Sequence, residues 1–211
     1  MNHTNKTFAY IGIAGALTMA LSDMILLGQP VSGSYYDLSS FGAMQHIDSM
    51  RAALGSMLGL IASFFICFGF WFLKKIFEPV NQKLSMILFI ALSSMMFFGG
   101  AFHAGYYFIS KPGLSPDSYN LIPQIVLNDF INHLELLSYL GVPGFLIGSI
   151  LFFKLSLDAQ FPKWLRYCNP LTLSFIFLAI FYFLPEPIGG YLKPTFLNLA
   201  TASLFIFSTR V

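Results

Sequence analysis

Six apolar stretches, each about as long as a bilayer is thick, constrain this chain more than any other feature of its sequence. A helix needs about 20 residues to cross the ~30 Å hydrocarbon core of a membrane. The stretches run from Phe8 to Gly28, Ala52 to Leu73, Leu84 to Ile109, Leu134 to Phe153, Cys168 to Leu184, and Ile188 to Ser208. We therefore predict one all-α domain over residues 1–211, a polytopic transmembrane helix bundle.

The composition excludes several other classes of protein. Only 9% of the 211 residues are charged and 56% are hydrophobic, whereas a soluble globular domain carries roughly 25% charged residues. The 25 Phe and 10 Tyr residues are too many aromatic rings for a disordered chain. The net charge is +2, and there is no basic run that would bind nucleic acid. Membrane lipids are the expected surroundings.

The last two stretches are separated by a short break. The tripeptide Pro-Glu-Pro at 185–187 stands between them, and proline cannot continue a helix through such a turn. The final stretch also carries Lys193 and Pro194 early, which indicates a short span that begins near Thr195. We expect six spans, with five spans as the alternative.

The positive charges that flank the stretches predict their orientation, because cytoplasmic loops are enriched in Lys and Arg. With the N-terminus in the cytoplasm, eight basic residues fall on the cytoplasmic side: Lys6, Lys74, Lys75, Lys83, Lys154, Lys163, Arg166 and Arg210. Three fall on the outer side: Arg51, Lys111 and Lys193. This bias predicts that both termini are cytoplasmic. Without a cleaved targeting segment, it suits a bacterial plasma membrane.

The segment 121–155 is longer than one span needs. As a single helix it would measure about 52 Å, so we expect its first part to lie in the outer interface or to dip into the protein. Its polar residues share one side at helical spacing: Asn128, Asp129, Asn132, His133 and Tyr139. A helix whose polar side faces the interior of the bundle would produce this pattern.

Ionisable residues occur within or beside the apolar stretches, where they usually face other polar groups or a cavity. The residues of this candidate polar site are Asp23, Asp48, Arg51, His103, Asp129, His133 and Glu186. In the six-span arrangement each lies in the outer half of a span or at its outer edge. We therefore predict that several segments bring acid, imidazole and guanidinium groups to one depth.

One interpretation of this cluster is a metal site in a membrane-embedded hydrolase that acts on a lipid or an amphiphile. Asp129 and His133 are four residues apart on one helix face, and carboxylate with neutral imidazole is suitable zinc ligation. His103 and Asp23 would complete the set, and Arg51 would bind an anionic group such as a lipid phosphate. Zinc is the cofactor that this interpretation implies.

Three other interpretations stay open. A His–Asp pair without metal can perform general acid–base chemistry, although no nucleophile motif such as GxSxG is present. Alternatively, the cluster binds or translocates a proton, an ion or a small polar molecule, and a break of the fourth span at Gly141–Gly144 would help to form its path. In the last interpretation the polar residues only hold the helices together, with Asp23 paired to Arg51 or His103. Binding or translocation is the active interpretation that we favour.

Two glycine pairs, Gly55 with Gly59 and Gly144 with Gly148, have the GxxxG spacing that lets helices approach closely. They predict either close packing within the chain or the seam of a homodimer. In a chain with 17 glycines such spacings also arise by chance.

Ionisable residues on several helices near one membrane face, such as Asp23, His103 and His133, resemble an arrangement in a superfamily of multi-span hydrolases. This is the alkaline ceramidase and progestin-receptor-like superfamily, whose His, Asp and Ser side chains hold zinc. That superfamily has seven spans and a paired-histidine motif, whereas here Tyr107 stands four residues after His103. No residue role is carried over from it.

A second resemblance rests on short motifs in the first half of the chain. The motif residues are Gly15, Asp23, Gly28, Arg51, Gly55, His103 and Ala104. Their pattern is similar to uncharacterised six-span bacterial membrane protein families. That resemblance implies a location in the membrane and no particular activity.

Overall fold

The computed structural model of the chain describes residues 3–28, 47–110 and 124–211, and every regular element within these ranges is a helix. Four helices are long: α1 (His3–Leu27), α3 (Ser49–Phe77), α4 (Gln82–Ser110) and α6 (Gln124–Leu155). Three shorter helices follow: α7 (Pro170–Tyr182), α8 (Ile188–Leu192) and α9 (Phe196–Ser208). Two 3₁₀ turns, η3 (Leu165–Cys168) and η4 (Lys193–Thr195), precede α7 and α9. The all-α class expected from the sequence is confirmed for this part of the chain.

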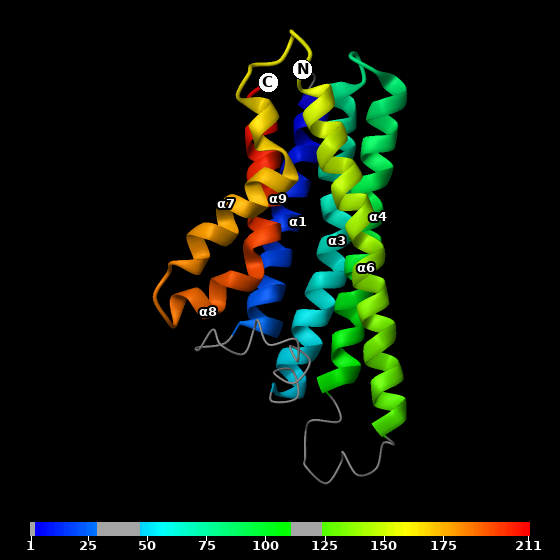
Figure 1. The fold of residues 1–211 in the computed structure, drawn as a ribbon, viewed down its shortest axis with the longest axis vertical. Coiled ribbons are helices and arrows are strands. Elements are labelled where there is room, and N and C mark those ends of the chain that lie inside the picture. The colour runs from blue at the N-terminus through cyan, green and yellow to red at the C-terminus, as the bar shows by residue number, and fades with distance from the viewer. Residues whose placement is uncertain (1–2, 29–46, 111–123) are drawn as a thin grey trace.

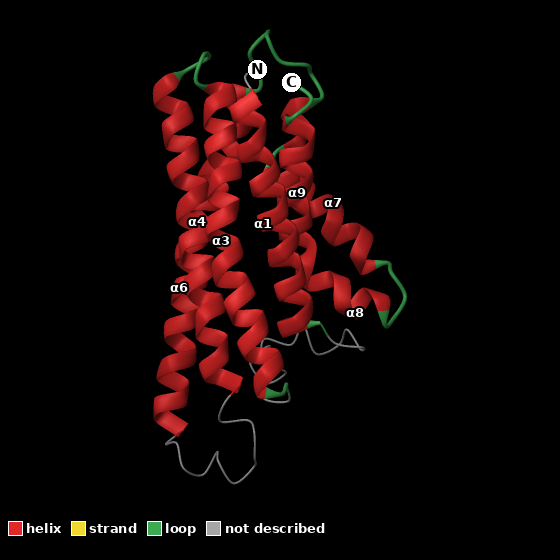
Figure 2. Cartoon of the chain, turned by 180° about the vertical axis from the view of Figure 1, so that it is seen from behind, coloured by secondary structure: helices red, strands yellow, loops and turns green. Residues whose placement is uncertain are grey.

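The four long helices stand side by side and alternate in direction, and the two ends of the chain lie at the same end of the molecule (Figures 1 and 2). Each long helix contains a stretch that is long and apolar enough to cross a membrane: Lys6–Leu27, Ser49–Phe77, Gln82–Phe108 and Asn128–Leu155. Four of the six expected spans are therefore present as helices of sufficient length.

Polar side chains define where the helices begin. Asp48 accepts a hydrogen bond from the backbone N–H of Arg51 at 2.8 Å at the start of α3. Asn169 does the same for the N–H of Thr172 at 3.0 Å at the start of α7. Such caps satisfy backbone donors that have no partner within the first turn of a helix.

Helix α6 differs from the sequence-based expectation in two ways. It is one continuous helix of 32 residues that contains Pro143, so the expected break at Gly141–Gly144 is wrong. The placement of its first part in the outer interface stays a prediction. Its polar residues do share one face, but that face is exposed instead of pointing into the bundle: Asn128, Asp129, Asn132, His133 and Tyr139. The reason is that the apolar side packs on α4, where Gly105 makes room for the buried Leu134.

The last two apolar stretches form a shorter arrangement than a pair of full spans. Helix α7 has 13 residues, about 20 Å of helix, which is less than the hydrocarbon thickness of a bilayer. The final stretch is divided into α8, η4 and α9. In Figure 1, α7 runs obliquely away from the long helices, α8 returns across the molecule, and α9 follows α1 back to the end that holds the termini. Six spans remain a prediction.

Two apolar clusters form the core. The larger cluster contains fully buried rings from three helices, including Phe77 and Phe152, which meet edge to face at 5.2 Å between centroids. Burial of one such side chain contributes about 1.5–3 kcal/mol. The smaller cluster, with Leu26 and Tyr106, lies further along α1 and α4. Asp23 and His103 stand between the two clusters in the order of both helices.

Glycines allow the long helices to approach closely. Gly12 on α1 faces Gly69 on α3 so closely that a Cβ on Gly12 would lie 2.4 Å from Gly69 Cα. The four glycines of both GxxxG pairs also face other helices of this chain, and a Cβ on each would lie within 2.5 Å of a neighbour: Gly55, Gly59, Gly144 and Gly148. Close packing inside the chain therefore accounts for the spacing of both pairs, and a homodimer seam through them stays a prediction.

Candidate functional site

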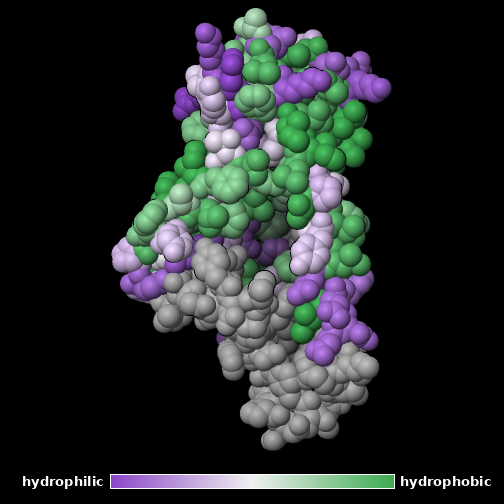
Figure 3. All heavy atoms as spheres, viewed as in Figure 1, coloured by the Kyte–Doolittle hydropathy of each residue, from purple (hydrophilic) through white to green (hydrophobic). Residues whose placement is uncertain are grey.

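A cavity of about 490 Å³ lies between the long helices and the short C-terminal helices. Its wall comes from α1, α4 and α6 on one side and from α7, η4 and α9 on the other. Most of the lining side chains are apolar, among them Met19, Met95, Phe145 and Phe196. Figure 3 shows the cavity as a hollow bordered above by hydrophobic residues, with hydrophilic residues deeper inside. This size is typical of a site for a small molecule.

The mouth of the cavity lies between α6 and α7. Val142 on α6 and Phe175 on α7 both line the cavity, yet 48% of Val142 and 64% of Phe175 are exposed. Residues that line a cavity and are also half exposed stand at its opening. Val142 lies near the middle of α6, so the cavity opens on the side of the molecule at mid-height.

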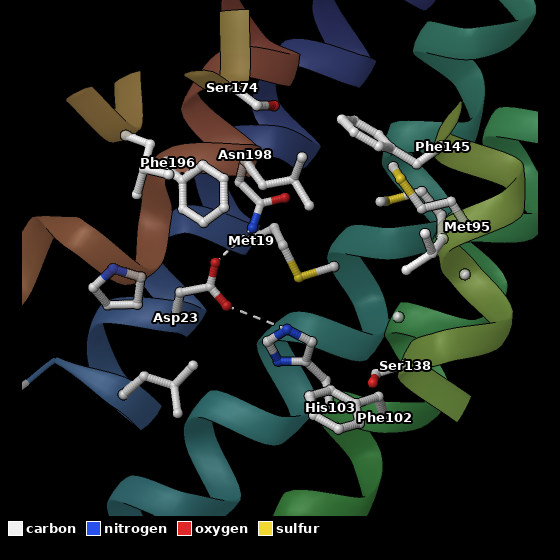
Figure 4. Close-up of a pocket in the computed structure, with 18 of the residues that line it drawn as sticks. Met19, Asp23, Met95, Phe102, His103, Ser138, Phe145, Ser174, Phe196 and Asn198 are labelled. Atoms are coloured by element: carbon white, nitrogen blue, oxygen red, sulfur yellow. Dashed lines mark hydrogen bonds and ion pairs between the residues drawn. The ribbon is translucent and has the colours of Figure 1, made fainter. Parts of the chain in front are cut away.

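Three polar side chains from three helices meet inside the cavity. His103 Nε2 on α4 lies 3.2 Å from Asp23 Oδ1 on α1. The amide of Asn198 on α9 donates a hydrogen bond to the other oxygen, Asp23 Oδ2, at 2.5 Å. All three residues are buried and line the cavity, and Figure 4 shows Asp23 between its two partners. We refer to them as the Asp23–His103–Asn198 group.

Ser22 supports this group from behind. Its hydroxyl donates a hydrogen bond to the Gly55 carbonyl at 2.7 Å and lies 3.3 Å from His103 Nδ1. Gly59 leaves the space for this arrangement, because a Cβ there would lie 2.5 Å from His103 Nδ1. Ser22 is fully buried and does not line the cavity. It therefore positions the histidine ring and has no access to a substrate as a nucleophile.

Each ring nitrogen of His103 faces a polar partner. The Ser22 proton is used by the Gly55 carbonyl, so the Ser22 oxygen faces His103 Nδ1 at 3.3 Å. His103 Nε2 faces a carboxylate oxygen of Asp23. Both nitrogens of the imidazole are therefore engaged within the protein, and Asp23 and His103 are partners of each other.

The polar atoms that remain available to a ligand are mainly acceptors. Asn198 Oδ1 makes no hydrogen bond with any residue that the structure describes. The hydroxyls of Ser138 and Ser174 line the cavity, but their protons bond to backbone carbonyls of their own helices at 2.8 and 2.7 Å. These oxygens can still accept. The cavity thus offers acceptor atoms to a ligand that carries a hydrogen-bond donor.

Two glycines border the cavity at positions where a larger side chain would not collide with a neighbouring helix. A Cβ on Gly99 would meet nothing within 4 Å, and one on Gly141 would have only ordinary contacts, the nearest at 3.7 Å. Every other glycine of α1, α3, α4 and α6 would place its Cβ within 2.7 Å of another atom. A glycine inside a helix lowers stability by roughly 0.5–1 kcal/mol relative to alanine. At Gly99 no packing contact accounts for the missing side chain, and the position borders the cavity.

The structure does not bring the remaining predicted residues into this site. Arg51 donates its Nε proton to the Ile25 carbonyl and an Nη2 proton to the Gly28 carbonyl at 2.6 Å. It therefore closes the C-terminal end of α1, where a positive charge is favoured, and is engaged there instead of pairing with Asp23. Asp48 is the cap of α3 described above.

Asp129, His133 and Glu186 are also separate from the cavity. Asp129 and His133 are exposed on α6 and do not line it. Glu186 accepts a hydrogen bond from the Gly190 N–H at 2.8 Å and pairs with Lys193 at 3.1 Å, which fixes the start of α8. The prediction of one polar cluster was wrong for these residues. Helical spacing indicates which residues share a face, but it does not indicate where that face points.

The predicted metal site is not assembled in the described residues. They contain no group of three or more His, Cys, Asp or Glu side chains that could hold a metal ion. Asp23 and His103 are in contact, whereas Asp129 and His133 lie elsewhere on α6. Two of the four predicted ligands are too few for a zinc site, which takes at least three protein ligands.

Asn198 is the residue of the site that sequence analysis missed. It stands within the last apolar stretch, in the sequence Phe-Leu-Asn-Leu-Ala. The search for unusual polar residues considered ionisable side chains alone. An uncharged amide in hydrocarbon also needs a hydrogen-bond partner, so the same reasoning extended to Asn would have identified it.

Comparison with known proteins places the chain in a family. No curated protein and no solved structure matches it. A family model described as "Family of unknown function (DUF6796)" matches residues 1–210, which is nearly the whole length. The chain therefore belongs to the DUF6796 family.

Proposed function

We propose that this chain is an integral membrane protein that binds a small, mostly apolar molecule in its cavity, with the Asp23–His103–Asn198 group as the polar contact. The observation that carries this proposal is a buried Asp–His pair inside an otherwise apolar cavity that opens on the side of the molecule. Binding sites of this kind combine an apolar wall with a few polar groups that fix orientation.

The outer surface of the long helices supports placement in a membrane. Large apolar side chains are widely exposed there, including Phe64 at 66% and Phe97 at 72%. Apolar patches of this extent on a water-soluble protein would be a liability. Lipid contact accounts for them.

The proposed topology has six crossings with both termini in the cytoplasm of a bacterial cell, the last two crossings being made by α7 and by α8 with α9. It is supported by the common end at which the N- and C-termini lie (Figure 1). The alternating directions of the long helices bring Lys74, Lys83 and Lys154 to that same end. A basic cytoplasmic face follows the positive-inside rule.

A structural role is the second candidate. It is favoured by the fact that Asp23, His103 and Asn198 already satisfy one another and join α1, α4 and α9. That role alone gives no reason for Gly99 to border empty space. The two functions therefore differ in what a side chain at position 99 would do.

The test uses Gly99→Leu, which fills the cavity where the structure has room. The full chain and this variant are purified in mild detergent, and small molecules that co-purify are extracted and measured by mass spectrometry. We expect a compound close to one equivalent with the wild type, reduced at least fivefold in Gly99→Leu. The matched control is Phe97→Leu, on the exposed side of the same helix, which should retain the compound. Equal amounts in all three proteins would leave the structural role as the explanation.

A further inference from the structure

We infer that the ligand is a membrane amphiphile with an uncharged hydroxyl-type headgroup and a long apolar tail, which reaches the cavity from the bilayer through the opening between α6 and α7. This inference rests on the proposed function and adds the class of ligand, its orientation and its route. It is carried by four features: the charge of the lining, the available acceptors, a second hollow along α7, and the height of the mouth.

The charge of the lining selects an uncharged headgroup. Asp23 and His103 are partners of each other at 3.2 Å, so neither is left over as a counter-charge for a ligand. Within the described residues no other Asp, Glu, Lys, Arg or His side chain lines the cavity. A charged headgroup would therefore be buried without a counter-charge, and a buried charge without a partner is strongly disfavoured.

The hydrogen-bonding atoms select a donor. Asn198 Oδ1 is without a partner in the described part of the chain, and Figure 4 shows it on the side of the amide opposite the nitrogen that faces Asp23. The hydroxyls of Ser138 and Ser174 donate their protons to backbone carbonyls of their own helices, so only their oxygens are available to a ligand, as acceptors. A hydroxyl donates one proton and also accepts, so it suits these atoms better than an ether or an ester, which only accept.

A second hollow gives the tail a place. It has a volume of about 410 Å³ and is lined by four residues of α7 and by Phe183, which follows the helix: Phe175, Leu178, Ala179, Tyr182 and Phe183. Phe175 and Leu178 also line the main cavity, so the two spaces adjoin. The apolar path thus continues from the Asp23–His103–Asn198 group, past the exposed Phe175, and along α7 to Phe183, which is 83% exposed.

The position of the mouth defines the route. The cavity residues of α6, from Ser138 to Phe145, occupy the middle of a helix that runs from Gln124 to Leu155. In a membrane-spanning bundle this height corresponds to the hydrocarbon core. A ligand that passes between Val142 and Phe175 therefore comes from lipid and not from water.

The experiment uses two photoreactive 16-carbon alcohols and the full chain reconstituted in phosphatidylcholine vesicles. One alcohol carries a diazirine beside the hydroxyl, and the other carries it at the far end of the chain. After irradiation, the modified residues are located by peptide mass spectrometry. We expect the first probe to label the interior at Met19 and Phe102, and the second to label the end of α7 at Tyr182 and the following Phe183. A scrambled or reversed pattern overturns the proposed orientation.

Competition tests the headgroup. Unlabelled hexadecanol, palmitic acid and hexadecylamine are added at equal mole fraction in the membrane. We expect hexadecanol to displace the probe at least tenfold more effectively than either charged analogue. Equal displacement by the acid or the amine overturns the uncharged headgroup.

Variants separate the two levels of the proposal. Gly99→Leu should reduce labelling by both probes at least fivefold, and Phe97→Leu should leave labelling unchanged. Labelling that Gly99→Leu does not affect contradicts the proposed function itself. Labelling that depends on Gly99 but avoids α7 contradicts only the tail path and lateral route, while the binding function stands.

Discussion

The contacts among the four long helices differ from their contacts with the C-terminal segment α7–α9. The long helices pack tightly on one another at glycines, whereas a cavity separates them from the short helices. Between α1 and α3, Gly12 and Gly69 bring two backbones into contact, and no space is left. On the side that faces α7 and α9, Gly99 borders open space. α7 is also short and leaves the bundle at an angle (Figure 1). One region is packed for stability, and the other keeps a cavity at the expense of packing.

The largest effect is expected where the two regions are joined. Asp23→Ala removes the common partner of His103 and Asn198, and it leaves the buried imidazole and amide between α1, α4 and α9 without that partner. We expect the free energy of unfolding to fall by about 3–5 kcal/mol. It can be measured by denaturant titration of the detergent-purified protein, followed by circular dichroism.

Asp48→Ala is the control for this loss, because it removes a carboxylate that only caps α3. An N-cap contributes about 1 kcal/mol. If both variants lose the same stability, the Asp23–His103–Asn198 group does not hold the two regions together.

The next prediction tests the contrast between the regions with one kind of substitution. Gly12→Leu forces α1 away from α3, because its Cβ would lie 2.4 Å from Gly69 Cα. Overpacking of this kind lowers the free energy of unfolding by about 1–3 kcal/mol or more. Gly99→Leu enters open space and should leave stability unchanged or raise it slightly. Equal destabilisation by both would mean that the cavity is as tightly packed as the α1–α3 contact.

A smaller effect is expected at the end of α1. Arg51→Met removes the hydrogen bonds to the carbonyls of Ile25 and Gly28. A positive charge at a helix C-terminus contributes about 1 kcal/mol, and the thermal midpoint should fall accordingly. Arg210→Met, at the exposed end of the chain, serves as the control. Retention of ligand by Arg51→Met would agree with its position outside the cavity, whereas loss of ligand would restore Arg51 as an anion-binding residue.

The sequence predicted the long helices well because their apolar stretches exceed the length that a bilayer requires. It predicted the last two elements less well, since hydropathy does not distinguish one long helix from the short α8, η4 and α9 in succession. Asp23 and His103 were identified individually as ionisable residues in apolar surroundings. Their contact across eighty residues depends on how α1 packs on α3 and α3 on α4, and no local pattern carries that information.

No sequence pattern predicted the cavity. It arises from the angle at which α7 leaves the bundle. The sequence also does not distinguish a glycine beside open space from a glycine that allows two helices to touch. Gly59 and Gly99 illustrate this: a Cβ on the first would strike His103, and a Cβ on the second would meet nothing. Asp129 and His133 illustrate a second limit of sequence analysis. Helical periodicity showed that they share one face of α6, but it did not show that this face is exposed.

The smallest expected effect lies beyond the end of α3, far from the cavity. Hydrogen bonds from Lys74 and then Lys75, at 2.5 and 3.0 Å, lower the pKa of the Glu78 carboxyl from its ordinary value. A carboxyl with a lowered pKa stabilises the fold above its unfolded-state pKa, and this contribution is lost as pH falls through the lowered value.

Glu78→Gln should therefore reduce the thermal midpoint slightly at neutral pH and not at all in acid below the lowered pKa. The measurement is the difference in thermal midpoint between wild type and Glu78→Gln across this range, because every other ionisable group is common to both proteins and its contribution cancels. A difference that grows as pH falls would contradict the assignment. It would mean that the pH dependence of stability does not come from the contacts of Lys74 and Lys75 with Glu78.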